Sequence, residues 1–168
     1  QFAWQDERKA QQHPPAARKK ARLPELPCWA VLAGPADLRE RLPVAPQRIL
    51  LPMNRTNLRQ LGALRKVQAK IIWQLPPILH EAELAWVAEQ IKRLTAAGWL
   101  RFSIAHCSQA ALFPARKGLE LYGQYTLNLL NSAALNAAAQ LLGLSAALLS
   151  IESEAATLTA ALRHFRQR

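Results

Sequence analysis

Four polar side chains in the second half of the chain have residue types and positions that could do chemistry. Asn128 and Asn131 lie three residues apart, Glu152 follows an apolar run, and Gln109 follows another. A carboxylate can move a proton, and amides can orient a substrate. We therefore predict Glu152 and Asn128 as catalytic residues, and Asn131 and Gln109 as substrate-binding residues.

Helix termini offer a simpler explanation for two of these residues. An asparagine directly before a helix caps its first turn, and this explains Asn131 better than substrate binding does. A carboxylate at Glu152 would favour the positive amino end of the following helix, and we weigh this explanation equally with a catalytic role.

The segment that carries three of these residues has the pattern of a strand, a helix and a second strand. Short apolar runs occupy residues 127–130 and 146–151, and Gly143 ends the helix between them. Within that helix, apolar residues recur at helical spacing: Leu135, Ala138, Ala139 and Leu142. Two strands joined in this way lie parallel, with a right-handed crossover. Parallel sheets carry their chemistry at the carboxyl ends of the strands, where these polar residues fall.

The same alternation extends over most of the chain. Predicted strands are residues 28–33, 48–51, 69–75, 100–105, 125–129 and 146–150. Predicted helices are residues 36–41, 56–67, 81–97, 132–142 and 154–165. This order indicates an α/β fold with a parallel sheet. A complete (β/α)8 barrel takes about 250 residues, so six strands form either an open doubly wound sheet or part of a barrel.

Basic residues are concentrated in the first half of the chain. The net charge is +11, and residues 1–70 contain 14 Lys or Arg against 5 Asp or Glu. Residues 1–24 are charged, contain paired prolines and lack apolar periodicity, so we predict a basic arm or linker before an α/β domain of residues 25–168. The arm's clustered cations are Arg18, Lys19, Lys20 and Arg22. They either contact nucleic-acid phosphates or keep a linker soluble.

The composition argues against several other classes of protein. No apolar run reaches the roughly 20 residues of a membrane helix, so we expect a soluble cytosolic protein without a membrane partner. Cys28 and Cys107 lie far apart, which argues against a disulfide framework, a zinc site or an iron–sulfur site in this chain. The first residue is Gln rather than Met, so we expect a piece of a longer protein.

Other reactive or aromatic side chains are weaker candidates. His106 and Cys107 follow a predicted strand, but neighbouring side chains point apart, whereas a nucleophile and its base must be within hydrogen-bond reach. Trp73, Trp86 and Trp99 could stack on nucleic-acid bases, but packing between elements explains them better.

Three segments resemble the collagenase-like peptidase family of unassigned catalytic type, numbered family thirty-two among such peptidases. They are residues 75–81 (LPPILHE), 122–132 (YGQYTLNLLNS) and 142–152 (LGLSAALLSIE). Of the family's serine, proline, glutamate and leucine order, only Ser150 and Glu152 match. The resemblance covers about residues 28–166 and implies a TIM-barrel-like catalytic module. Family members include collagenase-like proteases. Other members are needed for hydroxylating pyrimidines in RNA, or for hydroxylating the ubiquinone precursor.

The strands are most similar to the second barrel half of members that act on ribosomal RNA. The resemblance therefore implies a parallel TIM-barrel-like sheet forming an incomplete barrel, with a basic N-terminal arm, from an RNA-base hydroxylation factor. Its partners would be RNA and the remaining domains of a longer polypeptide. Two alternatives are a protease acting on collagen-like or denatured peptides, and a non-catalytic half that completes or docks onto another domain.

The resemblance also bears on cofactors. Several family members hold an iron–sulfur cluster, and the family's glycine- and cysteine-bearing segment would follow the end of this sequence. We therefore expect no cofactor in this chain, and the resemblance assigns an iron–sulfur cluster to the longer protein.

Overall fold

The computed structural model describes residues 28–39, 44–115 and 117–164. The predicted basic arm, residues 1–24, lies outside the described residues, as do its clustered cations. The described residues form one six-stranded sheet in which all strands are parallel and follow the order of the sequence. The strands are β1 (Trp29–Val31), β2 (Arg48–Pro52), β3 (Ile71–Gln74), β4 (Arg101–Ile104), β5 (Glu120–Gly123) and β6 (Leu144–Ala147).

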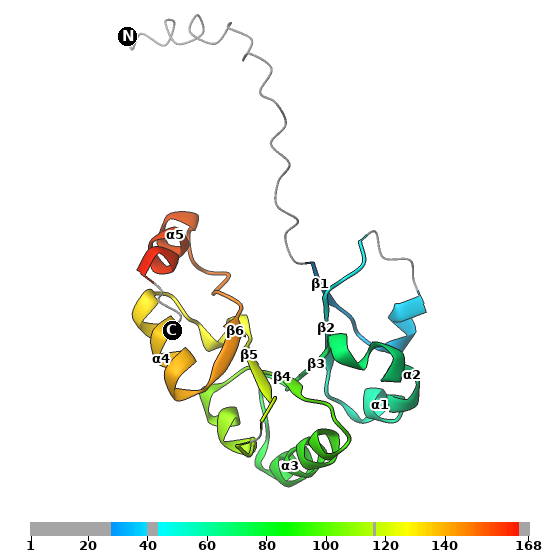
Figure 1. Cartoon of the computed structure of the whole chain (residues 1–168). Coiled ribbons are helices and arrows are strands. Elements are labelled where there is room, and N and C mark those ends of the chain that lie inside the picture. Colours follow the sequence, from blue (N-terminus) through cyan, green and yellow to red (C-terminus); the bar gives the residue numbers. More distant parts are fainter. Residues whose placement is uncertain (1–27, 40–43, 116, 165–168) are drawn as a thin grey trace, which may run out of the picture.

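The sheet curls into a half-barrel, with its helices on the outer, convex side (Figure 1). A doubly wound sheet would carry helices on both faces and would reverse its strand order at one point. Neither feature is present in the described sheet, so the prediction of an incomplete TIM-barrel-like sheet is confirmed. β1 and β6 form its two edges, and each pairs with one strand among the described residues.

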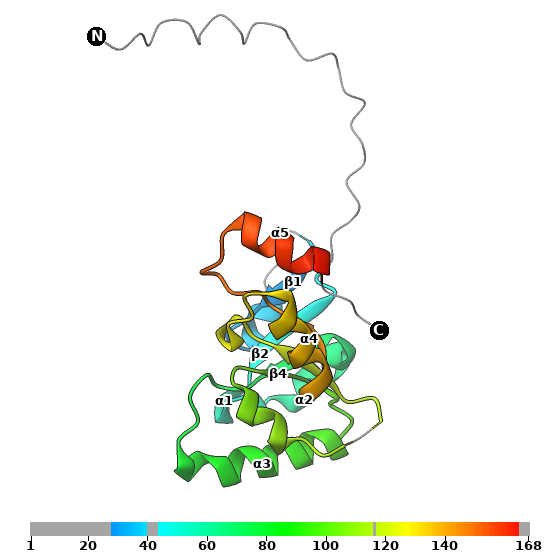
Figure 2. The same cartoon turned by 90° about the vertical axis from the view of Figure 1, so that its left-hand side faces the viewer.

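Helices and single helical turns cover the convex face. The α-helices are α1 (Arg55–Leu58), α2 (Leu61–Leu64), α3 (Glu81–Ala96), α4 (Ser132–Leu141) and α5 (Ala155–His164). The 3₁₀ helices are η1 (Pro35–Arg39), η2 (Arg65–Lys70), η3 (Cys107–Leu112) and η4 (Tyr125–Leu127). α4 and α5 pack side by side on one flank (Figure 2). None of the helices in the described part of the chain is long and apolar enough to cross a bilayer.

The longest helix, α3, follows directly from its sequence. Glu81 and Glu83 lie in its first turn, where carboxylates favour the helix dipole, and Arg93 lies in its last turn. Gly98 follows with a φ of 85°, a left-handed conformation that suits glycine and ends the helix. The helix predicted at residues 81–97 is therefore confirmed, with its end shifted by one residue.

Two predicted elements were wrong. The apolar run at 125–129 is not a strand: it contains η4, which ends at Asn128 with a φ of 52°, and a left-handed residue does not continue a strand. The strand is instead Glu120–Gly123, whose alternate side chains are polar and face the concave side. The helix predicted at 56–67 is divided into α1, α2 and η2, with Gln60 between the first two in a non-helical conformation (φ −105°, ψ 18°).

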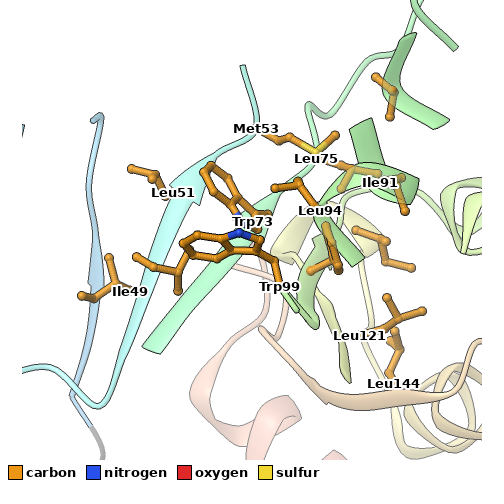
Figure 3. Close-up of a cluster of buried hydrophobic side chains, with 14 of the residues drawn as sticks. Ile49, Leu51, Met53, Trp73, Leu75, Ile91, Leu94, Trp99, Leu121 and Leu144 are labelled. Atoms are coloured by element: carbon orange, nitrogen blue, oxygen red, sulfur yellow. The ribbon is translucent and has the colours of Figure 1, made fainter. Parts of the chain in front are cut away.

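The main core lies between the convex face of the sheet and the helices (Figure 3). Trp73 of β3 and Trp99 are at most 1% exposed, and their rings meet edge to face with centroids 5.5 Å apart. Ile91 and Leu94 of α3 pack into the same cluster. The prediction that Trp73 and Trp99 are core residues is therefore confirmed.

The concave face carries a smaller buried cluster. Leu50, Ile72 and Tyr122 are buried there, and Trp29 packs edge-on against Tyr122 with ring centroids 5.5 Å apart. Side chains alternate between the two faces along a strand, which separates this cluster from the helix-facing core.

Beside this cluster, an ion pair joins the amino ends of β4 and β5. Arg101 Nη2 lies 2.9 Å from Glu120 Oε1, and the Tyr122 hydroxyl donates a hydrogen bond to the same carboxylate. Partial burial raises the pKa of Glu120. The hydrogen bonds from Tyr122 and Arg101, with the charges of Arg101 and Arg48, outweigh burial and leave that pKa below its usual value. The amino ends of barrel strands serve stability, and this network fits that role.

Candidate functional site at the carboxyl edge of the sheet

Three buried amide side chains hold together the loops that follow the strands. Asn57 Nδ2 donates to the carbonyl oxygens of Ala33 and Pro52, at 3.1 and 2.9 Å, which joins the loops after β1 and β2. Gln124 Nε2 donates to the carbonyl oxygens of Leu75 and Ser103, at 2.9 and 3.1 Å. These amides pair with carbonyl groups at or near the strand ends and so connect the loops along the carboxyl edge of the sheet.

Gln109, a predicted substrate-binding residue, is the third of these amides. Its Oε1 accepts a hydrogen bond from the Ala105 backbone N–H at 2.8 Å, and its Nε2 donates to the Pro76 carbonyl at 2.8 Å. The side chain is 4% exposed. The structure thus uses Gln109 to join the loops after β3 and β4.

The other predicted site residues lie in the loops after β5 and β6. Asn131 Oδ1 accepts a hydrogen bond from the Ala134 N–H at 2.8 Å and caps α4. Asn128 and Glu152 are exposed, and the backbone N–H of Glu152 donates to Ser150 Oγ at 3.3 Å. In the described part of the chain, no hydrogen bond or ion pair joins the side chains of Asn128, Asn131 and Glu152.

A different group of residues lines a series of neighbouring cavities along α3. It consists of three adjoining cavities, which we call the basic pocket (about 450 Å³), the middle cavity (about 280 Å³) and the loop cavity (about 510 Å³). Arg55 and Trp86 line both the basic pocket and the middle cavity. Leu79 lines both the middle cavity and the loop cavity. We call this series of cavities the α3 groove.

The α3 groove runs from the carboxyl edge of the sheet to the outer flank. Met53, Asn54 and Pro76, which follow β2 and β3, line the middle cavity. His106 and Ser108, which follow β4, line the loop cavity. A ligand in the groove would therefore touch the strand ends at which parallel α/β enzymes place their chemistry.

His106 and Ser108 form a contact that resembles a hydrolase pair. His106 Nδ1 lies 2.8 Å from Ser108 Oγ, and the same nitrogen accepts the Ser108 backbone N–H at 3.3 Å. Both bonds lie within one turn at the start of η3, as in a helix cap. A catalytic pair also requires a third group that orients the base, and no other hydrogen bond to the His106 ring is present among the described residues. This contact is therefore a cap, with no sign of a catalytic pair.

The side chains of the described residues do not fit an iron–sulfur cluster or another metal centre. No group of three His, Cys, Asp or Glu side chains comes together in residues 28–39, 44–115 and 117–164. The whole sequence has two cysteines, whereas an iron–sulfur cluster is held by about four ligands. No chemical step in this chain is therefore assigned to a metal.

Sequence reasoning missed the residues of the basic pocket. One signal was present: Arg55 and Arg59 are four residues apart, so a helical turn places them on the same side. Their partners Trp86 and Arg93 come from α3, more than 25 residues later in the sequence. Only the packing of α3 beside α1 and α2 brings these four side chains to one cavity.

Comparison with known proteins gives no further assignment. No protein-family model, curated protein or solved structure matches this chain. Membership of the collagenase-like peptidase family therefore stays a prediction from the resemblance of three segments.

Proposed function

We propose that this chain is the RNA-binding half-barrel of a cytoplasmic RNA-modification protein of the collagenase-like peptidase type, one that hydroxylates a pyrimidine base. The observation that carries the proposal is the charge on one flank of the fold. The exposed cations on α1, η2 and α3 are Arg55, Arg59, Arg65, Lys66, Lys70, Lys92 and Arg93. The described carboxylates on the same elements are Glu81, Glu83 and Glu89.

An excess of cations over one flank favours a polyanion. Lys and Arg side chains release condensed counterions from nucleic acid when they contact its phosphates, and this release drives binding without a defined sequence. The predicted basic arm would add to the same attraction, since Arg18, Lys19, Lys20 and Arg22 precede the domain. A neutral peptide substrate would gain nothing from these charges, so the flank supports RNA binding more than proteolysis.

The half-barrel supports the second part of the proposal. The α3 groove lies at the carboxyl ends of β2, β3 and β4, where a bound base would lie close to loops that buried amides connect. In this proposal the residues of this chain bind and orient RNA, while the oxidative chemistry comes from another part of the longer protein. Glu152 and Asn128 stay our predicted catalytic residues, in the loops after β6 and β5.

A salt titration of the full chain with a fluorescently labelled RNA oligonucleotide tests the proposal. We expect the logarithm of the binding constant to fall linearly with the logarithm of salt concentration, with a slope of about −0.7 per phosphate contact for a single strand. Replacing Arg18, Lys19, Lys20 and Arg22 with Ser should weaken binding about uniformly across RNA sequences and make the slope shallower. Absence of RNA binding by the unmodified chain at low salt would overturn the proposal.

A second candidate function is that of a non-catalytic half that docks onto further strands. The edges of the sheet favour it, because β1 and β6 each pair on one side among the described residues. Val31, at the β1 edge, is 70% exposed, although it is a large apolar residue. An exposed apolar edge strand offers unpaired N–H and C=O groups to another strand.

Hydrogen exchange distinguishes docking from free edges. In this second candidate function, amides of β1 and β6 exchange slowly in the longer protein and rapidly in the isolated chain, whereas β3 amides are protected in both. Equal protection of β1 in both proteins would reject docking at that edge.

A further inference from the structure

The basic pocket gathers three positive charges on its walls. Arg55, Arg59 and Arg93 line it together with Trp86, and none of the described residues that line it is acidic. Like charges repel each other, and a concave surface with low-dielectric walls increases the positive potential that they produce. An anion in the pocket would relieve this repulsion.

The three guanidinium groups come from two elements and reach the same space. Arg55 and Arg59 lie one turn apart at the start and the end of α1, and Arg93 lies in the last turn of α3. Arg55 stacks over the Trp86 ring, 4.6 Å from its centroid. Stacking fixes the plane of the guanidinium but leaves its N–H groups free to donate to a phosphate.

No carboxylate neutralises these arginines in the described part of the chain. The ion pair present there joins Arg101 to Glu120, on the concave face of the sheet. Within the pocket, Arg93 Nη1 makes a long hydrogen bond of 3.5 Å to Gln90 Oε1. These arginines line an open cavity, and a phosphate can accept two parallel N–H bonds from one arginine.

We propose that the basic pocket binds a phosphodiester of single-stranded RNA and leads the strand into the middle cavity. This inference rests on the proposed RNA binding above and names the site that performs it. The pocket volume of about 450 Å³ is in the usual range of about 300 to 1,000 Å³ for ligand sites, so a phosphate and its sugar both fit.

The lining residues shared by the basic pocket and the middle cavity favour a strand over a free phosphate ion. Arg55 and Trp86 line the basic pocket and the middle cavity, so a nucleotide bound at one is adjacent to the other. A single strand can also place an unstacked base in the middle cavity, which the paired and stacked bases of a duplex cannot do.

The test compares two variants of the full chain that lose the same charge. The pocket variant carries Arg55→Gln, Arg59→Gln and Arg93→Gln. The control variant carries Lys66→Gln, Lys92→Gln and Lys117→Gln, at exposed lysines that do not line the pocket. Affinity for a labelled single-stranded RNA is measured over a range of salt concentrations, and circular dichroism checks that each variant folds.

We expect the pocket variant to bind at least about 20-fold more weakly at low salt, with a slope shallower by up to about 2, since each lost contact contributes about 0.7. The control variant should lose about threefold or less, because Lys66 and Lys92 add to the positive potential of the flank but do not line the pocket. If the triple variant does not fold, the single variants Arg59→Gln and Arg93→Gln, both changed at exposed residues, are measured in its place.

Three results would overturn the assignment of RNA binding to the basic pocket without contradicting RNA binding by the chain. They are equal losses by the two variants, competition by inorganic phosphate as strong as that by unlabelled single-stranded RNA, and preference for duplex RNA that the pocket variant retains. If the unmodified chain binds no RNA at low salt, the proposed function itself fails, which is a different result from any of these three.

Discussion

The loops after β5 and β6 and the α3 groove lie on the same half-barrel, yet they use polar residues in opposite ways. In the first region, Asn131 bonds to backbone within its own loop and caps a helix. In the groove, Arg55, Arg59 and Arg93 line open space without a carboxylate partner in the described part of the chain. This difference shows that a polar residue near a strand end often stabilises the fold by bonding to backbone groups. Polar groups without an internal partner are better evidence for a ligand.

The largest effect should come from an amide at the carboxyl edge of the sheet. Gln124→Leu removes both hydrogen bonds of Nε2 and leaves the buried Leu75 carbonyl without this donor. A buried group left unpaired costs about 1–3 kcal/mol, so we expect the free energy of unfolding to fall by about 2–3 kcal/mol. Urea denaturation followed by tryptophan fluorescence measures it.

The matched control for this change is Gln140→Leu, at an exposed position on α4. Substitutions at such positions usually change stability by less than about 0.5 kcal/mol. If both variants unfold at the same urea concentration, the buried amides do not hold the loops together, and the comparison drawn above is wrong.

A smaller loss is expected at Asn131. Asn131→Ala removes the oxygen that accepts the Ala134 N–H and should lower the free energy of unfolding by about 1 kcal/mol, the usual cost of losing an N-cap. Asn131→Ser restores an acceptor and should recover most of the loss. RNA binding should be unchanged in both variants. A tenfold loss of RNA affinity in folded Asn131→Ala would show that Asn131 contributes to RNA binding and does not only cap α4.

The network on the concave face predicts a pH signature of stability. Glu120 has a pKa below its usual value in the folded chain, so its contribution is present above about pH 4.3, the usual value in an unfolded chain, and is lost as pH falls through the folded pKa. Glu120→Gln should therefore lower stability at pH 7, by about 1 kcal/mol or less for this partly exposed pair.

The same variant provides its own control at acid pH. Once Glu120 is protonated, the unmodified chain and Glu120→Gln should approach equal stability, because neither then carries a charge opposite Arg101. Denaturation midpoints at a series of pH values measure this convergence. A difference that stays constant down to pH 3 would show that packing, and not charge, explains the effect.

The smallest effect is expected at Glu152. Its side chain is exposed, and no hydrogen bond or ion pair of that carboxylate is present in the described part of the chain. Glu152→Gln should change stability by less than about 0.5 kcal/mol and leave RNA affinity unchanged. The activity proposed above, base hydroxylation by the proposed longer protein, is the informative assay: a large loss there supports a catalytic carboxylate, whereas full activity would remove Glu152 from the site.

Much of the fold could be predicted from periodicity alone. The spacing of apolar residues in α3 and α4 and the short runs at β2, β3 and β4 depend on neighbours in the sequence, so local patterns were sufficient. β5 was missed because Glu120 and Tyr122 are polar residues within a strand. In the folded chain Glu120 pairs with Arg101 on the neighbouring strand and accepts a hydrogen bond from Tyr122, which local sequence does not reveal.

The sequence by itself determined a parallel α/β sheet, five of its six strands, and a basic first half. It did so because helical and strand periodicity and net charge are properties of the chain that do not require its packing. Tertiary structure alone decided which polar groups stay available to bind a ligand. Burial and hydrogen-bond geometry assigned Gln109 to two backbone partners, and the packing of α3 against α1 placed Arg93 beside Arg55 and Trp86. Residues distant in sequence form a site only when the elements that carry them pack together, and no local pattern contains that information.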